Sequence, residues 1–386
     1  MLLTNTLLSQ FSYSLRFMTL LLVIALIPVS AQGEQKQDAC SAELQKLIRA
    51  VAQNETLYQN LRLQLTCSEV AHAGWFLHDD SIKVKRQSTI ALTVQGEKFA
   101  ERTQTSGDFV KHLTGGLGWL KEGFRDSASR TVKEETRPFQ IRTGTRTITS
   151  VFDGTSYQYF MEDKLRNQGA TEPPRLEQDG MISDQSPGLT DLARPHMFLF
   201  EPAGPRVPLS VYLAGREAIR EYTGESKSNF RFTTRIQITG RERLQGLDCT
   251  TVRIETFDAN GKPRSRNDLW LAQDRNLIPI RKLHYSYRQS KELPCSESRV
   301  ETWQEVREGV WFPRKTFIER YDSNILRREL IQVTSWRNDY EVESIELNPQ
   351  LPEDVFTRLN IPPEVLMKKR NRGNNNHQKK EADSNQ

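Results

Sequence analysis

The strongest structural signal in this sequence is the stretch 232–280, FTTRIQITGRERLQGLDCTTVRIETFDANGKPRSRNDLWLAQDRNLIPI. Apolar and polar residues alternate along it, with the two-residue period of a strand that has one buried face. Turn sequences at Gly246, at Asn260-Gly261 and at residues 274–276 divide it into short runs. Strands joined by tight turns at such short intervals predict an antiparallel meander.

The same alternation continues on both sides of this stretch. Upstream it ends in a turn at Asp153-Gly154, and downstream it is interrupted by a turn at residues 307–309. We therefore expect about ten strands and a mainly β (α+β) fold. The other predicted strands are 82–84, 90–94, 148–152, 300–306, 311–320 and 330–333.

An amphipathic helix is predicted before the strands. Between Asp38 and about Leu65, apolar residues recur at helical spacing with charged residues between them. We expect one helix or two short ones, with Asp38 or Ser41 accepting the unpaired backbone N–H groups at its start. The apolar stripe predicts packing against the sheet, and it consists of Leu44, Leu47, Ile48, Val51, Leu57 and Leu61.

Two insertions interrupt the strand pattern, at about 108–125 and at 162–208. The first is rich in apolar residues and glycine, which indicates short helices or an apolar loop that acts as a lid. The second contains too many prolines for the interior of a sheet. We interpret it as a long connection around the domain, partly buried at residues 197–200.

Residues 1–31 have the organisation of a cleavable signal peptide. Arg16 precedes the apolar run 18–27, and Val29 and Ala31 are the small residues that favour cleavage after Ala31. The run is too short to cross a hydrocarbon core of about 30 Å. An uncleaved anchor or a buried helix is the alternative. We expect a periplasmic or secreted protein without a stable membrane span after cleavage, whose residues 37–363 form a single domain.

Composition limits the classes of partner. The chain has 36% hydrophobic and 27% charged residues, which is typical of a soluble globular protein. Its net charge of +5 is concentrated near the C-terminus, where residues 364–386 are predicted to be a disordered basic tail. The body is nearly neutral and lacks a basic stripe interleaved with aromatic residues. We therefore expect no binding of nucleic acid.

All four cysteines lie after the predicted signal peptide. They allow three pairings, of which the most local joins Cys40 to Cys67 and Cys249 to Cys295. An oxidising compartment favours disulfides. The sequence alone does not ensure that either pair reaches the Cα separation of roughly 4.4–6.8 Å that a disulfide needs.

The order of these elements resembles a known family. An N-terminal helix is followed by antiparallel hairpins, by the turn LWLAQDRNLIP at 269–279, by GVWFP at 309–313 and by LPEDVF at 351–356. This order resembles the LolA/LolB-like family of periplasmic lipoprotein carriers, the outer-membrane lipoprotein-sorting proteins, to which the sigma-E regulator RseB is related. The resemblance implies an unclosed β-barrel, or half-barrel, with helices over its concave side and an interior that receives acyl chains.

Apolar residues of the first insertion and of the late strands are candidates for a binding groove or lid. A ligand pocket is mostly apolar with a few polar anchors. A core needs the same side chains, so core packing is the alternative for each of them. The candidates are Phe109, Leu113, Leu117, Trp119, Trp270, Trp303 and Trp311.

Catalytic and metal-binding signatures are absent from the sequence. There is no G-x-S-x-G, no H-E-x-x-H and no phosphate-binding loop. Residues 78–80 (His-Asp-Asp) are the densest group of metal ligands, and we interpret them as a solvated loop. His196, His284 and Asp268 are the residues that a hydrolytic site would have to bring together. We expect no catalytic residues, no metal and no cofactor.

The sequence therefore predicts an exported, non-catalytic protein of the cell envelope that binds or carries lipid or lipoprotein acyl chains. An envelope sensor or scaffold that binds a protein partner, as RseB does, is the alternative, and a hydrolytic enzyme is the third. An interior filled by side chains would favour the second hypothesis over the first.

Overall fold

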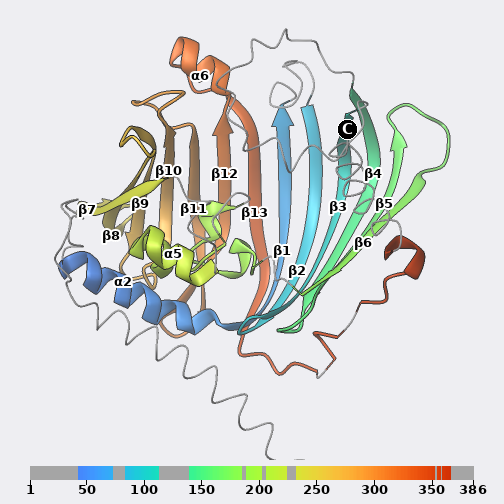
Figure 1. Cartoon of the computed structure of the whole chain (residues 1–386), viewed down its shortest axis with the longest axis horizontal. Helices are drawn as coiled ribbons and strands as arrows, with labels where there is room; N and C mark the ends of the chain where they lie inside the picture. The colour runs from blue at the N-terminus through green and yellow to red at the C-terminus, as the bar shows by residue number, and fades with distance from the viewer. Residues whose placement is uncertain are drawn as a thin grey trace, which may run out of the picture. The chain divides into compact units, whose positions relative to one another are not determined.

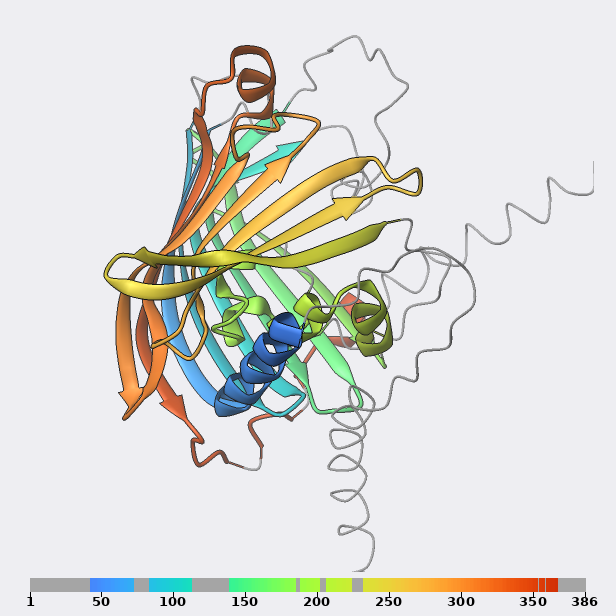
Figure 2. The same ribbon diagram turned by 90° about the vertical axis from the view of Figure 1, so that its left-hand side faces the viewer.

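The computed structural model describes residues 42–72, 83–112, 139–184, 188–201, 206–223, 232–352, 354–357 and 359–366. These residues form one antiparallel sheet of thirteen strands. The sheet is strongly curved, and its edge strands β6 and β7 do not pair with each other, so it is an unclosed β-barrel (Figures 1 and 2). This confirms the predicted mainly β fold with an open barrel, although the sheet has more strands than predicted.

The strands are β1 Asn60–His72, β2 Lys83–Gln95, β3 Lys98–His112, β4 Phe139–Phe152, β5 Tyr157–Asn167, β6 Arg175–Ser183, β7 Thr233–Leu244, β8 Leu247–Phe257, β9 Pro263–Ala272, β10 Pro279–Ser286, β11 Ser296–Arg307, β12 Val310–Tyr321 and β13 Thr334–Leu347. The α-helices are α2 Ala42–Glu55, α4 Leu209–Ala214, α5 Arg216–Thr223 and α6 Ser323–Glu329. The 3-10 turns are η1 Thr56–Tyr58, η3 Asp191–Ala193 and η4 Phe198–Phe200.

The chain builds the sheet as two meanders that meet in its centre. From β1 each strand pairs with the next one out to the edge strand β6. The chain then runs through η3, η4, α4 and α5, and enters the opposite edge at β7. The second meander returns to β13, which pairs with β1 in an antiparallel register. We call β1–β6 the first meander and β7–β13 the second meander.

Local sequence explains most of these elements. In β1, Leu61, Leu63 and Leu65 are fully buried and alternate with the exposed Arg62 and Gln64. That alternation fits a pleated strand with one buried face. The same residues show where the helix prediction was too long: α2 ends at Glu55, and Leu61 and Leu65 belong to a strand.

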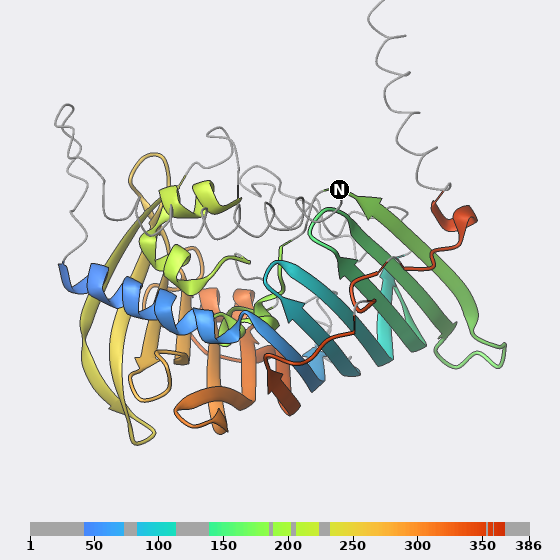
Figure 3. The same cartoon turned by 90° about the horizontal axis from the view of Figure 1, so that it is seen from below.

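Helix α2 packs on the second meander, as its apolar stripe predicted. Leu44, Leu47, Ile48 and Val51 are buried in one cluster with strand residues such as Leu269. Figure 3 shows α2 lying across the concave side of the β7–β13 half of the sheet. The predicted capping residues Asp38 and Ser41 lie outside the described residues.

The two predicted insertions are only partly insertions. Residues 108–112 are the end of β3, so the lid interpretation is wrong for them, and residues 113–125 lie outside the described part of the chain. The stretch 162–208 contains the end of β5 and all of β6. A strand forms there because Pro173 and Pro174 precede β6 and leave its backbone N–H groups intact. Residues 197–200 are buried, as expected.

The predicted strand at 330–333 is also wrong. Helix α6 precedes this segment, which begins with Leu330 in the left-handed conformation, and β13 begins only at Thr334. The apolar residues of the segment are exposed, so no cross-strand partner covers them.

Beyond β13 the chain crosses to the convex face of the first meander. Ile361 and Val365 are buried, and a Cβ on Gly180 of β6 would come within 2.7 Å of Ile361 Cγ2. The Leu359 N–H donates to the buried Gln158 side chain at 2.8 Å. Residues 364–366, at the start of the predicted disordered tail, therefore belong to the folded part of the chain. The predicted signal peptide, 1–31, and the rest of the basic tail lie outside the described residues.

Candidate ligand-binding surface

The concave face of the sheet is filled differently in its two halves. Helix α2 contacts β7, and η4 contacts β10, β11 and β12. In Figure 3 the described helices lie over the second meander and the centre, and none covers the outer strands of the first meander. The candidate binding surface is therefore the part of the concave face of β2–β5 that lies outside the buried cluster of Leu92, Phe99 and Phe152.

Aromatic packing closes the centre of the second meander. Phe198 of η4 has no exposed surface and meets Phe312 and Tyr340 edge-on, with ring centroids 6.1 and 5.6 Å apart. His196 is fully buried, and its Nε2 lies 2.8 Å from the Asn276 carbonyl oxygen. Burial lowers the pKa of His196 to about 4. These side chains therefore pack against one another in the centre of the concave face.

Lys282 shows how polar groups are accommodated in this filled half. Its Nζ donates to the Leu199 carbonyl at 3.2 Å and lies 4.7 Å from the centre of the Phe200 ring. Burial is the main cause that lowers the pKa of Lys282 to about 8, and the Arg320 charge adds to it. The interior carries a cation here, with a backbone carbonyl and an aromatic face as its partners.

The first meander presents a half-buried surface instead, which we call the open strip: Ser88, Thr103, Thr105, Ile148 and Met161. The register places Thr105 opposite Ser88, and Ile148 between Thr103 and Met161. Directly paired residues of neighbouring strands point to the same face. All five side chains are partly exposed, and the strip mixes apolar side chains with hydroxyls.

A charged belt of Glu69, Arg86, Arg146 and Asp163 borders the open strip. Arg146 donates two hydrogen bonds of 2.7 Å to Asp163, a bidentate pair that raises the pKa of Arg146. Arg86 Nη1 lies 3.6 Å from Glu69 Oε2. The two arginines flank the Phe109 ring, with guanidinium carbons 5.5 and 5.0 Å from its centre. These paired charges fix the side chains that face the end of the strip.

Two glycines allow β3 and β4 to approach their neighbours beside this belt. Gly107 and Gly144 pair with each other and both have positive φ, 129° and 151°. A Cβ at Gly107 would clash with the Lys85 carbonyl oxygen, and one at Gly144 with that of Lys164. The strands therefore cannot keep this geometry with any other residue at either position.

Three carboxyl groups, which we call the boundary acids, lie between the open strip and the filled half: Glu101 of β3, Asp191 of η3, and Glu201. Burial raises the pKa of all three carboxyl groups. The charge of Glu201 further raises the pKa of Glu101 and of Asp191, and the pKa of Asp191 reaches about 7. Thr190 Oγ1 donates to Glu201 at 2.8 Å. Arg194 Nη1 lies 4.0 Å from Asp191, and Arg206 also favours the charged form of each acid.

The structure does not bring the predicted groove residues together. Phe109 is buried between the belt arginines, and Trp303 packs against the hydrophobic core. Trp270 and Trp311 lie on the opposite face of the sheet from their buried neighbours Leu269 and Phe312. Leu113, Leu117 and Trp119 lie outside the described residues. Ligand contact by any of the seven stays a prediction.

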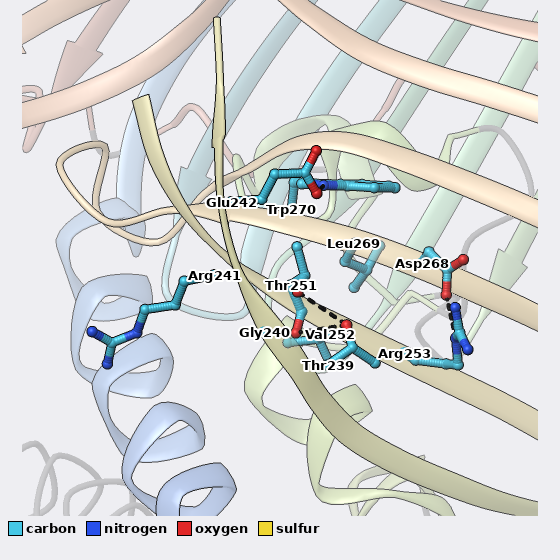
Figure 4. Close-up of a pocket in the computed structure, with 10 residues that line it drawn as sticks. All are labelled: Thr239, Gly240, Arg241, Glu242, Thr251, Val252, Arg253, Asp268, Leu269 and Trp270. Atoms are coloured by element: carbon cyan, nitrogen blue, oxygen red, sulfur yellow. Dashed lines mark hydrogen bonds and ion pairs between the residues drawn. The ribbon is translucent and has the colours of Figure 1, made fainter. Parts of the chain in front are cut away.

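Trp270 does line a shallow pocket of about 340 Å³ on the convex side of β7–β9 (Figure 4). Its Nε1 donates to Glu242 at 2.9 Å, and Arg253 donates to Asp268 at 2.8 Å across the pocket floor. Thr239 Oγ1 donates to Thr251 Oγ1 at 3.0 Å. These polar side chains bind one another, and the irregularity at Gly240 in the β7–β8 register accounts for the hollow.

The candidate catalytic residues are also kept apart. His196 contacts Asn276, His284 Nδ1 lies 2.9 Å from Asn267 Oδ1, and Asp268 pairs with Arg253 and Arg266. Residues 78–80 lie outside the described part of the chain. Within the described residues no group of three or more His, Cys, Asp and Glu side chains is placed to hold a metal ion.

The described thiols of Cys67, Cys249 and Cys295 are free. Cys249 is opposite Ala272 of β9. The Cys295 N–H donates to the His284 carbonyl, and His284 is opposite Asn267, which precedes Ala272 by five positions in β9. At about 3.3 Å per strand residue this separation exceeds the reach of a disulfide. The predicted Cys249–Cys295 pairing therefore does not form in this structure. Cys40 lies outside the described residues, so Cys40–Cys67 stays a prediction.

The sequence analysis missed the charged belt. Strand β4 was predicted only over 148–152, yet Arg146 continues the alternation of Ile148 and Ser150 and faces the same side. Extending that alternation by one step would have placed an arginine beside the groove. No local signal indicated that Asp163 would be its partner.

No family model and no curated protein matches this sequence. Among solved structures, a DUF1329 family protein from Desulfovibrio piger aligns over 81% of this chain and 95% of its own, at 12% identity and a TM-score of 0.35. A putative outer membrane lipoprotein-sorting protein domain from Vibrio parahaemolyticus aligns over 82% of this chain and 95% of its own, at 10% identity and a TM-score of 0.34. Similarities this weak carry no argument about this chain.

Proposed function

We propose that this chain is an exported, non-catalytic protein of the cell envelope that binds lipid or lipoprotein acyl chains on the concave face of β2–β5. The observation that supports the proposal is the asymmetry of the half-barrel. Core side chains fill the concave side of the second meander and part of the first, where Leu92, Phe99 and Phe152 are buried. The open strip leaves Ile148 and Met161 partly exposed on the same face.

The chemistry of the strip suits a molecule with an apolar body and a polar end. Each buried CH₂ group of a ligand would contribute about 0.8 kcal/mol. Thr103, Thr105 and Ser88 supply hydroxyls, and Ser88 and Thr105 already hydrogen-bond each other at 2.8 Å. The charged belt lies at one end of the strip, where a polar headgroup would find Arg146. Binding of this kind needs neither bond making nor a cofactor.

A protein-binding envelope module is the second candidate. The filled interior of the second meander favours it, because the buried side chains of the described residues occupy the concave side where an acyl chain would otherwise lie. The mixed polarity of the open strip is also compatible with a peptide segment, since protein interfaces combine apolar contacts with hydrogen bonds.

The test is to purify the exported chain from a membrane-containing host, and to apply native mass spectrometry and lipid extraction. We expect co-purifying acyl lipid. Ile148→Gln should reduce its occupancy at least several-fold, because the amide would enter the acyl path. Thr149→Gln is the matched control, since this neighbour points to the other face of β4.

A ligand-free protein that takes up no added lipid would overturn the acyl-chain proposal and favour the protein-binding alternative. Equal lipid loss in Ile148→Gln and Thr149→Gln would place the ligand elsewhere. The mass of the intact chain tests export in the same experiment, because cleavage after Ala31 leaves Gln32 as the first residue.

A further inference from the structure

The segment after α6 exposes an unusual run of apolar side chains. All seven residues 327–333, RRELIQV, are exposed, and Leu330, Ile331 and Val333 keep 53%, 52% and 43% of their surface accessible. Eight large hydrophobic residues are exposed in the described part of the chain, and three of the eight lie within the four positions 330–333. We call residues 327–333 the α6 tip.

The fold holds the α6 tip in place. Asp322 caps α6 by accepting the Asn324 and Ile325 N–H groups at 2.8 Å each, and Leu326 anchors the helix in the core. At the other end, the Asp322 N–H donates to the Val333 carbonyl at 2.8 Å, which closes the loop at its base. The exposed side chains are therefore presented by a closed loop.

Leu330 adopts a conformation that is costly for its residue type. Its φ is +55°, in the left-handed region, and its N–H donates to the Leu326 carbonyl. Glycine is the usual residue at this position of a helix end. A leucine that accepts this strain and is exposed gains nothing for the core, which points to a role at the surface.

Basic side chains surround the apolar ones. Arg327 and Arg328 form the last turn of α6, and Glu329 is the acidic residue between them and Leu330. Gln332 Nε2 donates to the Pro294 carbonyl at 2.9 Å, so the tip contacts the loop that joins β10 and β11. That loop exposes Lys291 and Glu292, whose charges offset each other. Within the tip itself, the two arginines outnumber the one acid, Glu329.

We propose that the α6 tip is a docking element for an anionic lipid bilayer. Figure 1 shows α6 protruding from the end of β12, so the apolar residues sit on a projection rather than in a groove. Such a projection suits insertion at the level of the lipid headgroups, where apolar side chains leave water and arginine meets acidic lipids. This inference is independent of acyl-chain binding on the open strip.

The experiment is flotation of the purified exported chain with vesicles of phosphatidylcholine containing 30% phosphatidylglycerol, and with vesicles of phosphatidylcholine alone. We expect binding to the anionic vesicles that weakens as salt is added. Leu330→Ser combined with Ile331→Ser should weaken it at least tenfold. Arg327→Gln combined with Arg328→Gln should weaken it several-fold at low salt and less at high salt.

The matched control is Leu176→Ser combined with Ile182→Ser, which removes two equally exposed apolar side chains from β6 (52% and 54%). This control should bind as the unaltered chain does. All variants keep the basic C-terminal residues, so any contribution from those residues is common to them. Unchanged urea midpoints will show that the variants fold, and lipid extraction reports separately on the open strip.

Absence of binding to anionic vesicles would overturn the proposal, as would binding that the tip variants leave unchanged. Equal binding to both kinds of vesicle would overturn the role of the basic residues. An Ile331→Trp variant gives an independent readout. Its fluorescence should shift to shorter wavelength on anionic vesicles, and a shift produced instead by an envelope protein without lipid would assign the tip to a protein partner.

Discussion

The two meanders of this sheet have the same connectivity but different interiors. In the second, α2, η4 and α4 pack on the concave face, where strand residues such as Phe312 and Leu269 are completely buried. In the first, the corresponding concave face carries half-buried threonines, Ile148 and a belt of ion pairs. The difference shows that curvature alone does not make a binding site. The connecting segment fills one half, and its Leu192 and Ala193 belong to one buried cluster with Phe99 and Phe152 of the other, so that only the open strip stays partly exposed.

The largest expected effect tests the filled half. Phe198→Ala removes a fully buried ring that contacts Phe312 and Tyr340, and should destabilise the protein by about 3–5 kcal/mol. The matched change in the open half, Ile148→Ala, should cost about 1 kcal/mol, because that side chain is already half exposed. Urea denaturation measures both. Equal losses would mean that the two halves are packed alike.

The next largest loss of stability is expected from removing Glu55, the residue that links the end of α2 to the start of α4. The Glu55 carboxylate accepts the Leu209 N–H at 2.6 Å and the Ser210 hydroxyl, and so caps α4, whose own N-cap, Pro208, makes no side-chain cap. Glu55→Ala should cost about 1–3 kcal/mol because buried donors lose their acceptor. Amide exchange at Leu209 and Ser210 should accelerate. Unchanged exchange there would show that α4 does not depend on Glu55.

A pH titration sharpens the comparison at the boundary acids. The pKa of Asp191 is raised to about 7 in the folded protein from an ordinary value near 3.8, so the folded state binds the proton more tightly. Its contribution is fully present below about pH 4 and is lost as pH rises toward 7, with a slope of at most about 1.4 kcal/mol per pH unit. Asp191→Asn should flatten this slope in urea midpoints measured from pH 4 to 8. Burial also raises the pKa of Glu55, Glu101 and Glu201, which leave a residual slope, so a slope that the substitution leaves unchanged is the result that would exclude Asp191 as a contributor.

The smallest effect separates the convex face from the concave one. Trp270→Phe removes the hydrogen bond to Glu242 and should cost about 0.5–1.5 kcal/mol. Lipid occupancy should stay unchanged, because Trp270 faces away from the open strip. If occupancy falls as it does in Ile148→Gln, Trp270 belongs to the binding surface and the assignment of faces is incorrect.

Periodicity predicted the parts of this fold that depend on neighbours in the chain. Leu44, Leu47, Ile48 and Val51 showed the buried face of α2, and the alternation from Phe232 onward showed the hairpins. The predicted helix extended too far because Leu61 satisfies two periods. Its spacing from Val51 and Leu57 fits a helix, whereas its alternation with Leu63 and Leu65 fits a strand. Of the predicted groove residues that the structure describes, Phe109 contacts the charged belt, and ligand contact by the groove residues stays a prediction.

By itself, the sequence determined the class of structure: antiparallel strands with one buried face, tight turns, and one amphipathic helix. Local sterics and the burial of alternate side chains suffice for that. Only the tertiary structure decided that β1 pairs with β13, that residues 197–200 fill one half of the barrel, and that Arg146 meets Asp163 beside Phe109. These contacts join segments far apart in the chain, and no local period encodes which of many compatible strands or side chains will be neighbours.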